Sequence, residues 1–154
     1  MNDSILNTPT EAAFRLLLLF SVIPDGTYNQ QWLSAIDFMC IYGEMFDLCE
    51  KNLHGDSWMK FTEYAMRTWN IRDALHDLAA FGWITAVPTQ RGFVYQITQS
   101  GRSMALCFST SYAEPYRKNA AQCYELFGSY TEKELDLLIR HKALVASAEE
   151  KEHD

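Results

Sequence analysis

Histidine and cysteine are the side chains of this sequence most able to do chemistry, and their spacing argues against a catalytic or metal site. The four histidines are scattered, and none has a Cys, Asp or His partner at a recognised metal-ligand spacing. His76 and Asp77 look like a base beside a carboxylate, but adjacent residues of a helix do not face each other. A solvated or capping role is therefore the favoured interpretation of His76.

The cysteines and glycines lead to the same conclusion. Cysteine spacing includes no C-x-x-C pair, which is typical of reduced core thiols in a cytosolic protein; the residues are Cys40, Cys49, Cys107 and Cys123. The glycines stand singly, so no glycine-rich loop is present to hold a phosphate. We therefore expect a cytoplasmic protein that is not an enzyme and has no catalytic residue, cofactor or metal.

Basic side chains in the middle of the chain are the candidates for contact with DNA. The net charge of −7 excludes a protein that coats DNA through Lys and Arg alone. Residues 57–108 nevertheless hold five basic and three acidic side chains, against two basic and eight acidic in residues 1–56. The candidate contacts are Lys60, Arg67, Arg72 and Arg91. Because Asp73 and Asp77 oppose phosphate, we expect DNA to be bound weakly or only indirectly.

Aromatic side chains are the candidates for a partner-protein surface. The sequence has 4 Trp, 8 Tyr and 9 Phe, and aromatic residues are enriched at interfaces as well as in cores. A mixture of aromatic and cationic side chains is common at interface centres, and Tyr112, Tyr116 and Arg117 form one candidate surface of this kind. The predicted wing strand from Phe93 to Ile97, with Phe93 and Tyr95, is the other candidate surface. An equally weighted alternative is that the stripe of Tyr112, Tyr116 and Phe127 packs on the first helix.

Helix signals frame the first part of the chain. Thr8-Pro9-Thr10-Glu11 has the form of a capping box, and the apolar run from Ala12 to Ile23 predicts a central helix. This run is shorter than the roughly 20 apolar residues that span a bilayer, so no membrane association is expected. Helical spacing continues from Tyr28 to Glu50, with a break at Gly43.

The pattern then changes from helices to a hairpin. Residues 57–82 predict two short helices, the second ending at Gly82. Strands are expected at 83–87 and 93–97 around a turn at 88–92, followed by a helix from Thr98 or Ser100 to Leu106. This order predicts a mainly α fold with a small β-hairpin, namely a winged-helix core flanked by additional helices.

The domain prediction follows from these elements. We expect one winged-helix domain over residues 1–146, with a core at about 57–108. N-terminal helices at 8–50 and C-terminal helices at 111–146 would flank that core, the last helix starting at a second capping box, Thr131-Glu132-Lys133-Glu134. The remaining residues, 147–154, are predicted to be a charged, frayed tail.

The order of short motifs along the chain resembles a known family. The N-terminal motifs are Asn7-Thr8-Pro9-Thr10-Glu11, Phe14-Arg15-Leu16-Leu17-Leu18-Leu19, Asp37, Tyr42-Gly43 and Leu53-His54. The later motifs are Leu75 to Trp83, Gly92-Phe93-Val94-Tyr95-Gln96-Ile97-Thr98, Ser111-Tyr112, Tyr116-Arg117-Lys118-Asn119-Ala120, Phe127 and Glu134-Leu135. Together they resemble the small middle components of prokaryotic ABC-three-component defence systems, including the Lamassu type.

This resemblance implies a specific role and set of partners. It implies a non-catalytic, kleisin-like subunit that holds the heads of an SMC-like ATPase and an effector, such as a nuclease, together in an anti-phage or anti-plasmid complex. The alternative is a stand-alone winged-helix transcription regulator that binds DNA, since the fold alone does not decide the function. A gene for a long coiled-coil ATPase beside this one would favour the first interpretation.

Overall fold

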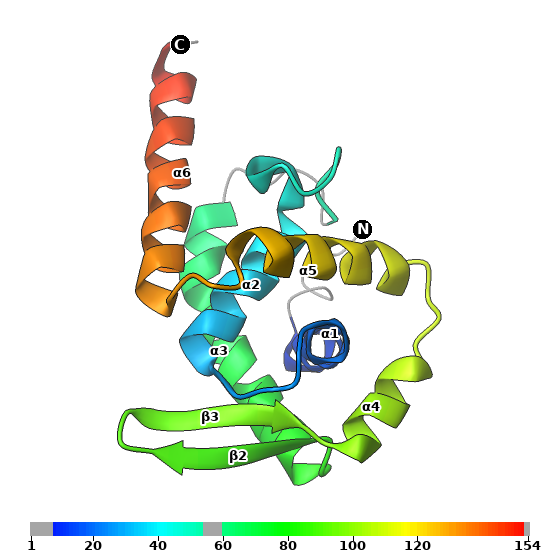
Figure 1. Ribbon diagram of the computed structural model, residues 1–154. Helices are drawn as coiled ribbons and strands as arrows, with labels where there is room; N and C mark the ends of the chain where they lie inside the picture. The colour runs from blue at the N-terminus through cyan, green and yellow to red at the C-terminus, as the bar shows by residue number, and fades with distance from the viewer. Residues whose placement is uncertain (1–7, 54–59, 153–154) are drawn as a thin grey trace.

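Helices form most of the molecule and surround a small antiparallel sheet (Figure 1). The computed structural model describes residues 8–53 and 60–152, except for the side chains of residues 60–63 and 150. The first elements are α1 (Pro9–Val22), β1 (Tyr28–Asn29), α2 (Gln30–Ile41), the 3-10 helix η1 (Gly43–Phe46) and α3 (Lys60–Ala80). The others are β2 (Ile84–Thr89), β3 (Gly92–Ile97), α4 (Gln99–Leu106), α5 (Ala113–Phe127) and α6 (Glu132–Glu152). The expected mainly α fold with a small hairpin is confirmed.

Helix α1 lies at the centre of the fold, as its sequence predicted. The Thr8 hydroxyl accepts a hydrogen bond from the Glu11 backbone N–H at 3.2 Å, which confirms Thr8 as the N-cap residue. Helices α3, α4 and α5 all contact α1, which Figure 1 shows nearly end-on among them. An apolar helix that is contacted on several sides buries most of its surface, so α1 organises a core to which every helix contributes.

The sheet has three strands rather than the predicted two. Its order is β1-β3-β2, with Tyr28 opposite Tyr95 and Thr89 opposite Gly92. The turn is therefore only Gln90-Arg91, shorter than predicted, and Gly92 has a φ of +108° that a residue with a side chain rarely adopts. The predicted helix start at Tyr28 was wrong because Tyr28 and Asn29 pair with β3, which lies far away in sequence.

Helix α3 is one continuous helix, so the prediction of two short helices was wrong. No glycine or proline lies between Lys60 and Ala80 to interrupt it, and residues 57–59 lie outside the described part of the chain. Its end was predicted correctly. Gly82 has a φ of +76°, and hydrogen bonds from the N–H groups of Gly82 and Trp83 to the carbonyls of Ala79 and Leu78 form a Schellman motif.

A close approach of the chain explains the break predicted at Gly43. Helix α2 ends at Ile41, and the chain turns through η1 instead of continuing as the predicted helix to Glu50. A Cβ atom at Gly43 would lie 2.9 Å from the Cys49 sulfur and 3.1 Å from the Asn119 amide nitrogen. Glycine is therefore required where the following loop folds back on α2.

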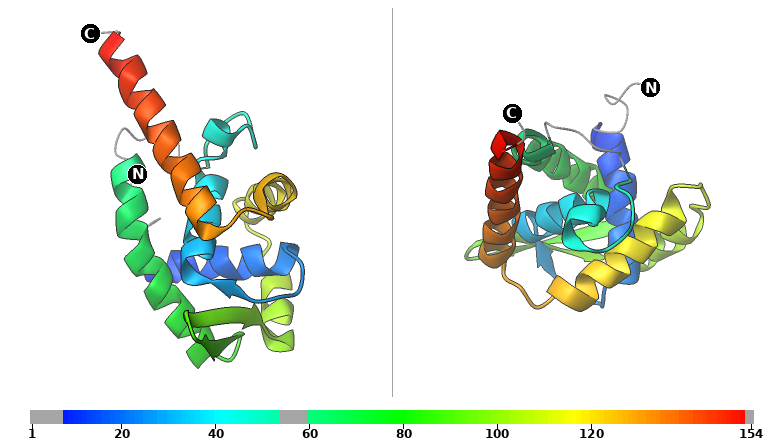
Figure 2. Two further views of the ribbon diagram at one scale, coloured as in Figure 1. Left: turned by 60° about the vertical axis from the view of Figure 1, so that its left-hand side comes forward. Right: turned by 90° about the horizontal axis from the view of Figure 1, so that it is seen from above.

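The last helix is longer than its sequence suggested. The Thr131 hydroxyl accepts a hydrogen bond from the Glu134 N–H at 3.2 Å and donates one to the Glu134 carboxylate, which confirms Thr131 as the N-cap of the last helix. Helix α6 then continues to Glu152, so residues 147–152 are helical rather than a frayed tail. Figures 1 and 2 show that the C-terminal half of α6 stands clear of the other helices.

Candidate functional site

A buried ionic network joins three helices at the centre of the molecule. Arg15 on α1 makes hydrogen bonds of 3.0, 3.1 and 3.3 Å to the Asp37 carboxylate on α2. The Tyr116 hydroxyl on α5 donates to the same carboxylate at 2.7 Å. The exposed fractions of Arg15, Asp37 and Tyr116 are only 3, 1 and 0 %. Such a carboxylate is satisfied by its neighbours and closed to any substrate.

The pKa values of this network follow from its geometry. Burial acts to raise the pKa of Asp37, but attraction to Arg15, the hydrogen bonds from Arg15 and Tyr116 and the charge of Arg67 together hold that pKa below its ordinary value. Burial raises the pKa of Tyr116 well above its ordinary value, and the neighbouring carboxylate raises it further. Asp37 therefore stays ionised and Tyr116 neutral at physiological pH. In these protonation states the network stabilises the packing of the helices that it joins.

Arg67, a predicted DNA contact, belongs to the same buried region. Its exposed fraction is 3 %, and its guanidinium lies 5.6 Å from the centre of the Tyr42 ring. Its charge also contributes to the low pKa of Asp37. A guanidinium held inside the fold cannot reach a phosphate, so Arg67 is removed from the DNA candidates. The network thus links α3 to α1, α2 and α5.

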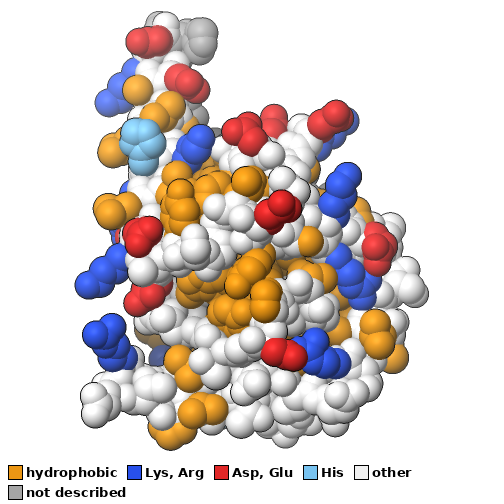
Figure 3. All heavy atoms as spheres, in the orientation of Figure 1, with side chains coloured by type: hydrophobic (Ala, Val, Ile, Leu, Met, Phe, Trp, Pro, Cys, Tyr) orange, Lys and Arg blue, Asp and Glu red, His pale blue; other side chains and the backbone are white. Residues whose placement is uncertain are grey.

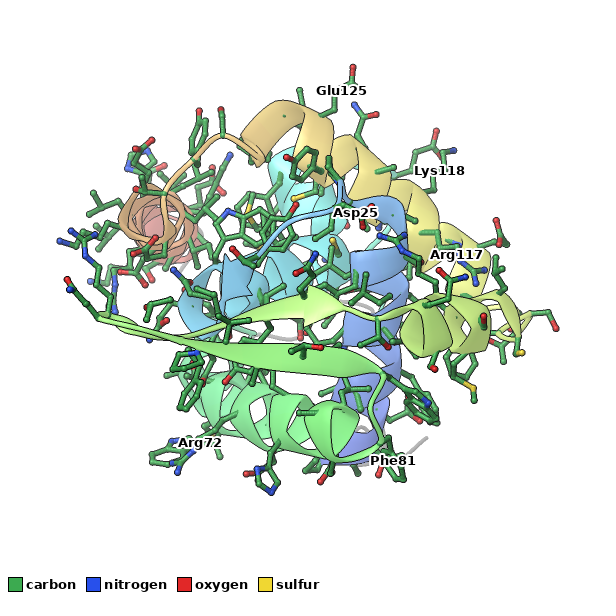
Figure 4. The ribbon with its side chains drawn as sticks, turned by 60° about the horizontal axis from the view of Figure 1, so that its bottom comes forward. Asp25, Arg72, Phe81, Arg117, Lys118 and Glu125 are labelled. Carbon is green, nitrogen blue, oxygen red and sulfur yellow. The ribbon has the colours of Figure 1, made fainter. Side chains whose placement is uncertain are left out.

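The predicted aromatic stripe on α5 packs inside the fold. Tyr116 is fully buried, and the ring of Tyr112, itself partly buried, stacks on it with centroids 6.1 Å apart. Arg117 donates to the backbone carbonyls of Ala105 and Phe108, at 2.7 and 3.1 Å, and to the Glu114 carboxylate. Tyr116 therefore cannot contact a partner. Arg117, which is labelled in Figure 4, holds the start of α5 against the end of α4. Packing inside the fold is the alternative that the sequence had left open.

The remaining DNA candidates lie on separate elements. Arg72 projects from the outer face of α3, where Figure 4 shows it pointing away from the body of the molecule, and its guanidinium lies 5.9 Å from the Trp69 ring. The same face exposes the carboxylates of Asp73 and Asp77. Arg91 lies at the tip of the hairpin, and the side chain of Lys60 lies outside the described part.

A wide groove lies between α3, the tip of the hairpin and the first half of α6, with residues of α2 on its floor. Its volume is about 1460 Å³. The walls expose Trp69 from α3, Phe93 from β3 and Leu137 from α6, with exposed fractions of 67, 56 and 67 %. Figure 3 shows Lys and Arg side chains, interspersed with Asp and Glu, along the edge where the base of α6 approaches the hairpin. Large apolar side chains are rarely left this exposed together unless something binds them.

Sequence reasoning found only part of this groove. Phe93 and Arg91 had been singled out, and both line it. Tyr95 is half-buried on the same strand, where it pairs with Tyr28 of β1. Trp69 and Leu137 were missed because their exposure depends on where α3 and α6 dock, which helical periodicity does not specify.

The sequence matches a known protein family over most of its length. Residues 5–149 match the family described as ABC-three component (ABC-3C) system Middle Component 2. The chain belongs to that family. No curated protein and no solved structure matches it. Its family membership confirms the resemblance at the level of ABC-three-component systems and means that this middle component has partner proteins.

Three further observations concern the side chains and helices of this ABC-3C middle component. In residues 8–53 and 60–152, no three His, Cys, Asp or Glu side chains are grouped so that they could hold a metal ion. Within the same ranges, no helix combines the length and apolar character needed to cross a membrane. The four cysteines are free, with Cys40 and Cys123 buried.

Proposed function

We propose that this middle component is a non-catalytic, kleisin-like subunit of a cytoplasmic, Lamassu-type defence complex. It would hold an SMC-like ATPase and an effector, such as a nuclease, in one assembly. Membership of the ABC-three-component family supports an accessory role in a defence system. The partners named here come from the motif resemblance described above.

Exposed apolar side chains carry this proposal. Met66 and Trp69 on α3 and Leu137 on α6 are each 67 % exposed, and Phe93 on β3 is 56 % exposed. A soluble protein rarely leaves large apolar side chains of neighbouring elements in water, and such patches mark protein interfaces. Trp is moreover one of the residues most often found at the energetic centre of an interface. Docking on a larger protein therefore explains these exposed apolar side chains better than a function without a protein partner does.

The fold itself is compatible with a winged helix used for protein contacts. A short strand between two helices, a third helix and then a hairpin, with the sheet order β1-β3-β2, supports a winged-helix assignment. In such a fold α3 would face the DNA. Among the described side chains on the outer face of α3, the positive charge of Arg72 is accompanied by the negative charges of Asp73 and Asp77. This balance disfavours the binding of DNA phosphates and favours a protein partner.

Co-expression with the ATPase and effector of its own system tests the proposed function. With a tag on the ATPase, the wild-type chain is expected to co-purify at a fixed ratio. A Trp69→Ala, Phe93→Ala variant is expected to bind at least tenfold more weakly, because central aromatic residues contribute about 2 kcal/mol or more each at interfaces. Leu106→Ala is the matched control, since Leu106 is 82 % exposed but lies on α4, outside the groove. The proposal is contradicted if the wild-type chain co-purifies with neither the ATPase nor the effector.

The alternative function, a stand-alone transcription regulator, is supported by the winged-helix order of elements and predicts tight binding to a specific DNA sequence, whereas the proposed function predicts only weak DNA binding. Arg72 and Arg91 are exposed, so we expect weak duplex binding that falls steeply with salt. Arg72→Ala and Arg91→Ala are each expected to reduce the slope of log affinity against log salt by about one unit. Fluorescence anisotropy with a labelled duplex measures this slope. Nanomolar binding to one specific sequence in physiological salt would instead support the regulator.

A further inference from the structure

The groove has the dimensions of a site for a polypeptide segment. Small-molecule sites typically enclose about 300–1,000 Å³, and this groove, at about 1460 Å³, is larger. Its walls come from three elements, namely α3, the hairpin and α6 (Figure 4 shows the hairpin tip between the other two). A chain segment can contact all three walls at once, whereas a metabolite would leave much of the groove in water.

Each wall offers the groove an apolar anchor point. Trp69, Phe93 and Leu137 come one from each wall, and each exposes more than half of its surface. On the floor, Ser34 of α2 is 4 % exposed, and its hydroxyl has no hydrogen-bond partner in the part of the chain that the structure describes. Because that hydroxyl is itself shielded from the surface, the apolar side chains of the walls, and not Ser34, are the contacts that an occupant would make.

The charges around the groove indicate the character of the occupant. Three basic residues line it, Arg91 on the hairpin and Lys133 and Arg140 on α6, in a chain whose net charge is −7. Of its two carboxylates, Asp136 is already engaged. It accepts hydrogen bonds from the Arg140 guanidinium at 2.7 Å and from the Tyr64 hydroxyl at 3.2 Å.

The charged side chains of the groove outside the Asp136–Arg140 pair have a net positive charge. Arg91 and Lys133 form no ion pair within the described ranges, and Glu132 is the remaining carboxylate of the groove. An occupant that brings carboxylates would therefore meet two unengaged cations on opposite walls. Electrostatic complementarity of this kind selects partners and speeds their association.

We propose that this groove binds an acidic segment of a partner subunit, in which one or two large apolar side chains are flanked by Asp or Glu. The apolar side chains would pack against Trp69, Phe93 and Leu137, and the carboxylates would lie between Arg91 and Lys133. This inference rests on the proposed function, since it takes the segment from a subunit of the same system.

A protein segment fits these walls better than a nucleic acid does. Phosphates need a continuous row of cations, whereas Glu132 and Asp136 place carboxylates among the cations of the α6 wall. The exposed apolar side chains would also gain little from a duplex backbone.

Overlapping synthetic peptides that cover the ATPase and effector subunits test the proposal on the full-length chain. Isothermal titration with each peptide is expected to identify an acidic segment with apolar anchors. The variant Arg91→Glu, Lys133→Glu is expected to weaken this peptide at least tenfold, and Phe93→Ala about tenfold. Lys118→Glu is the matched charge control, because Lys118 is exposed on α5 away from the groove (Figure 4) and should change the affinity less than twofold.

A charge-swapped peptide makes the test sharper. When its carboxylates are replaced by Lys, the peptide should lose binding to the wild-type chain and regain it with Arg91→Glu, Lys133→Glu. Both outcomes are required by the proposal. All these substitutions are at exposed positions, so circular dichroism should show an unchanged fold.

Other outcomes overturn the proposal. It is wrong if the bound peptides are basic, if charge reversal leaves the affinity unchanged, or if single-stranded or duplex DNA displaces the peptide. If the intact subunits co-purify but no peptide binds, the groove assignment fails while the proposed function stands. If the wild-type chain co-purifies with neither subunit, the proposed function fails and this inference fails with it.

Discussion

Replacing Asp37 with alanine is expected to lower the free energy of unfolding by about 3–5 kcal/mol, because the substitution leaves the buried Arg15 without its counter-ion. Arg15 would keep its charge at an exposed fraction of 3 %, and the Tyr116 hydroxyl would lose its acceptor at the same time. A loss of this size is a large share of the stability of an ordinary domain. Urea unfolding followed by circular dichroism measures it.

Asp136→Ala is the matched control for this prediction. Asp136 also forms an ion pair with an arginine, but Arg140 is 70 % exposed, and pairs of that kind contribute about 0–1 kcal/mol. If Asp37→Ala changes the free energy of unfolding by no more than Asp136→Ala does, the buried network does not stabilise the fold as the geometry indicates.

The pH dependence of stability gives an independent check on Asp37. Its pKa in the folded state is below its ordinary value, so its contribution is complete above the unfolded pKa of about 3.9. The contribution is then lost as the pH falls through the folded-state pKa. Asp37→Asn should therefore remove part of the acid-induced loss of stability, which urea unfolding between about pH 2 and pH 6 would show.

Gly101→Ala should be the most damaging single-methyl substitution in the hairpin region. A Cβ atom at Gly101 of α4 would overlap the backbone carbonyl oxygen of Trp83 and lie 2.9 Å from the Ile97 side chain. The carbonyl is held by the Thr98 N–H, so it cannot move aside, and α4 must shift from the sheet. We expect a loss of about 3 kcal/mol from this overpacking.

Thermal unfolding measures the effect of Gly101→Ala. A loss of about 3 kcal/mol corresponds to a fall in Tm of about 6–12 °C in a chain of this size. Ser103→Ala, at an exposed position of the same helix, should leave the Tm nearly unchanged or raise it slightly. Equal Tm values for Gly101→Ala and the wild type would show that α4 does not pack on Trp83 as described.

Local signals predicted much of this fold correctly. Three kinds of feature depend on residues within a few positions of each other. They are the helix N-caps at Thr8 and Thr131, the helix end at Gly82 and the hairpin. Strand β1 was missed because two residues become a strand only when a distant strand pairs with them. Helix α6 was predicted too short because charge composition does not by itself end a helix.

The candidate site was less predictable than the fold. Arg15 and Asp37 are 22 residues apart, and Asp37 and Tyr116 are 79 apart, so no spacing rule brings them together. Arg67 and Tyr116 were therefore assigned to surfaces although both are buried. Phe93 was identified as an aromatic residue of the predicted wing strand, whereas Leu137 was missed, because α6 exposes it only by docking through Leu135 and Ile139.

The central claim is that this chain holds two other subunits together, and recovery of the ATPase on a tagged effector tests it most directly. The ATPase and the effector would be co-expressed with and without this chain, and the ratio of ATPase to effector would be measured by native mass spectrometry. The proposed function predicts a fixed ratio when the wild-type chain is present and loss of the ATPase when the chain is omitted or carries Trp69→Ala, Phe93→Ala. Equal recovery of the ATPase without this chain would contradict the account.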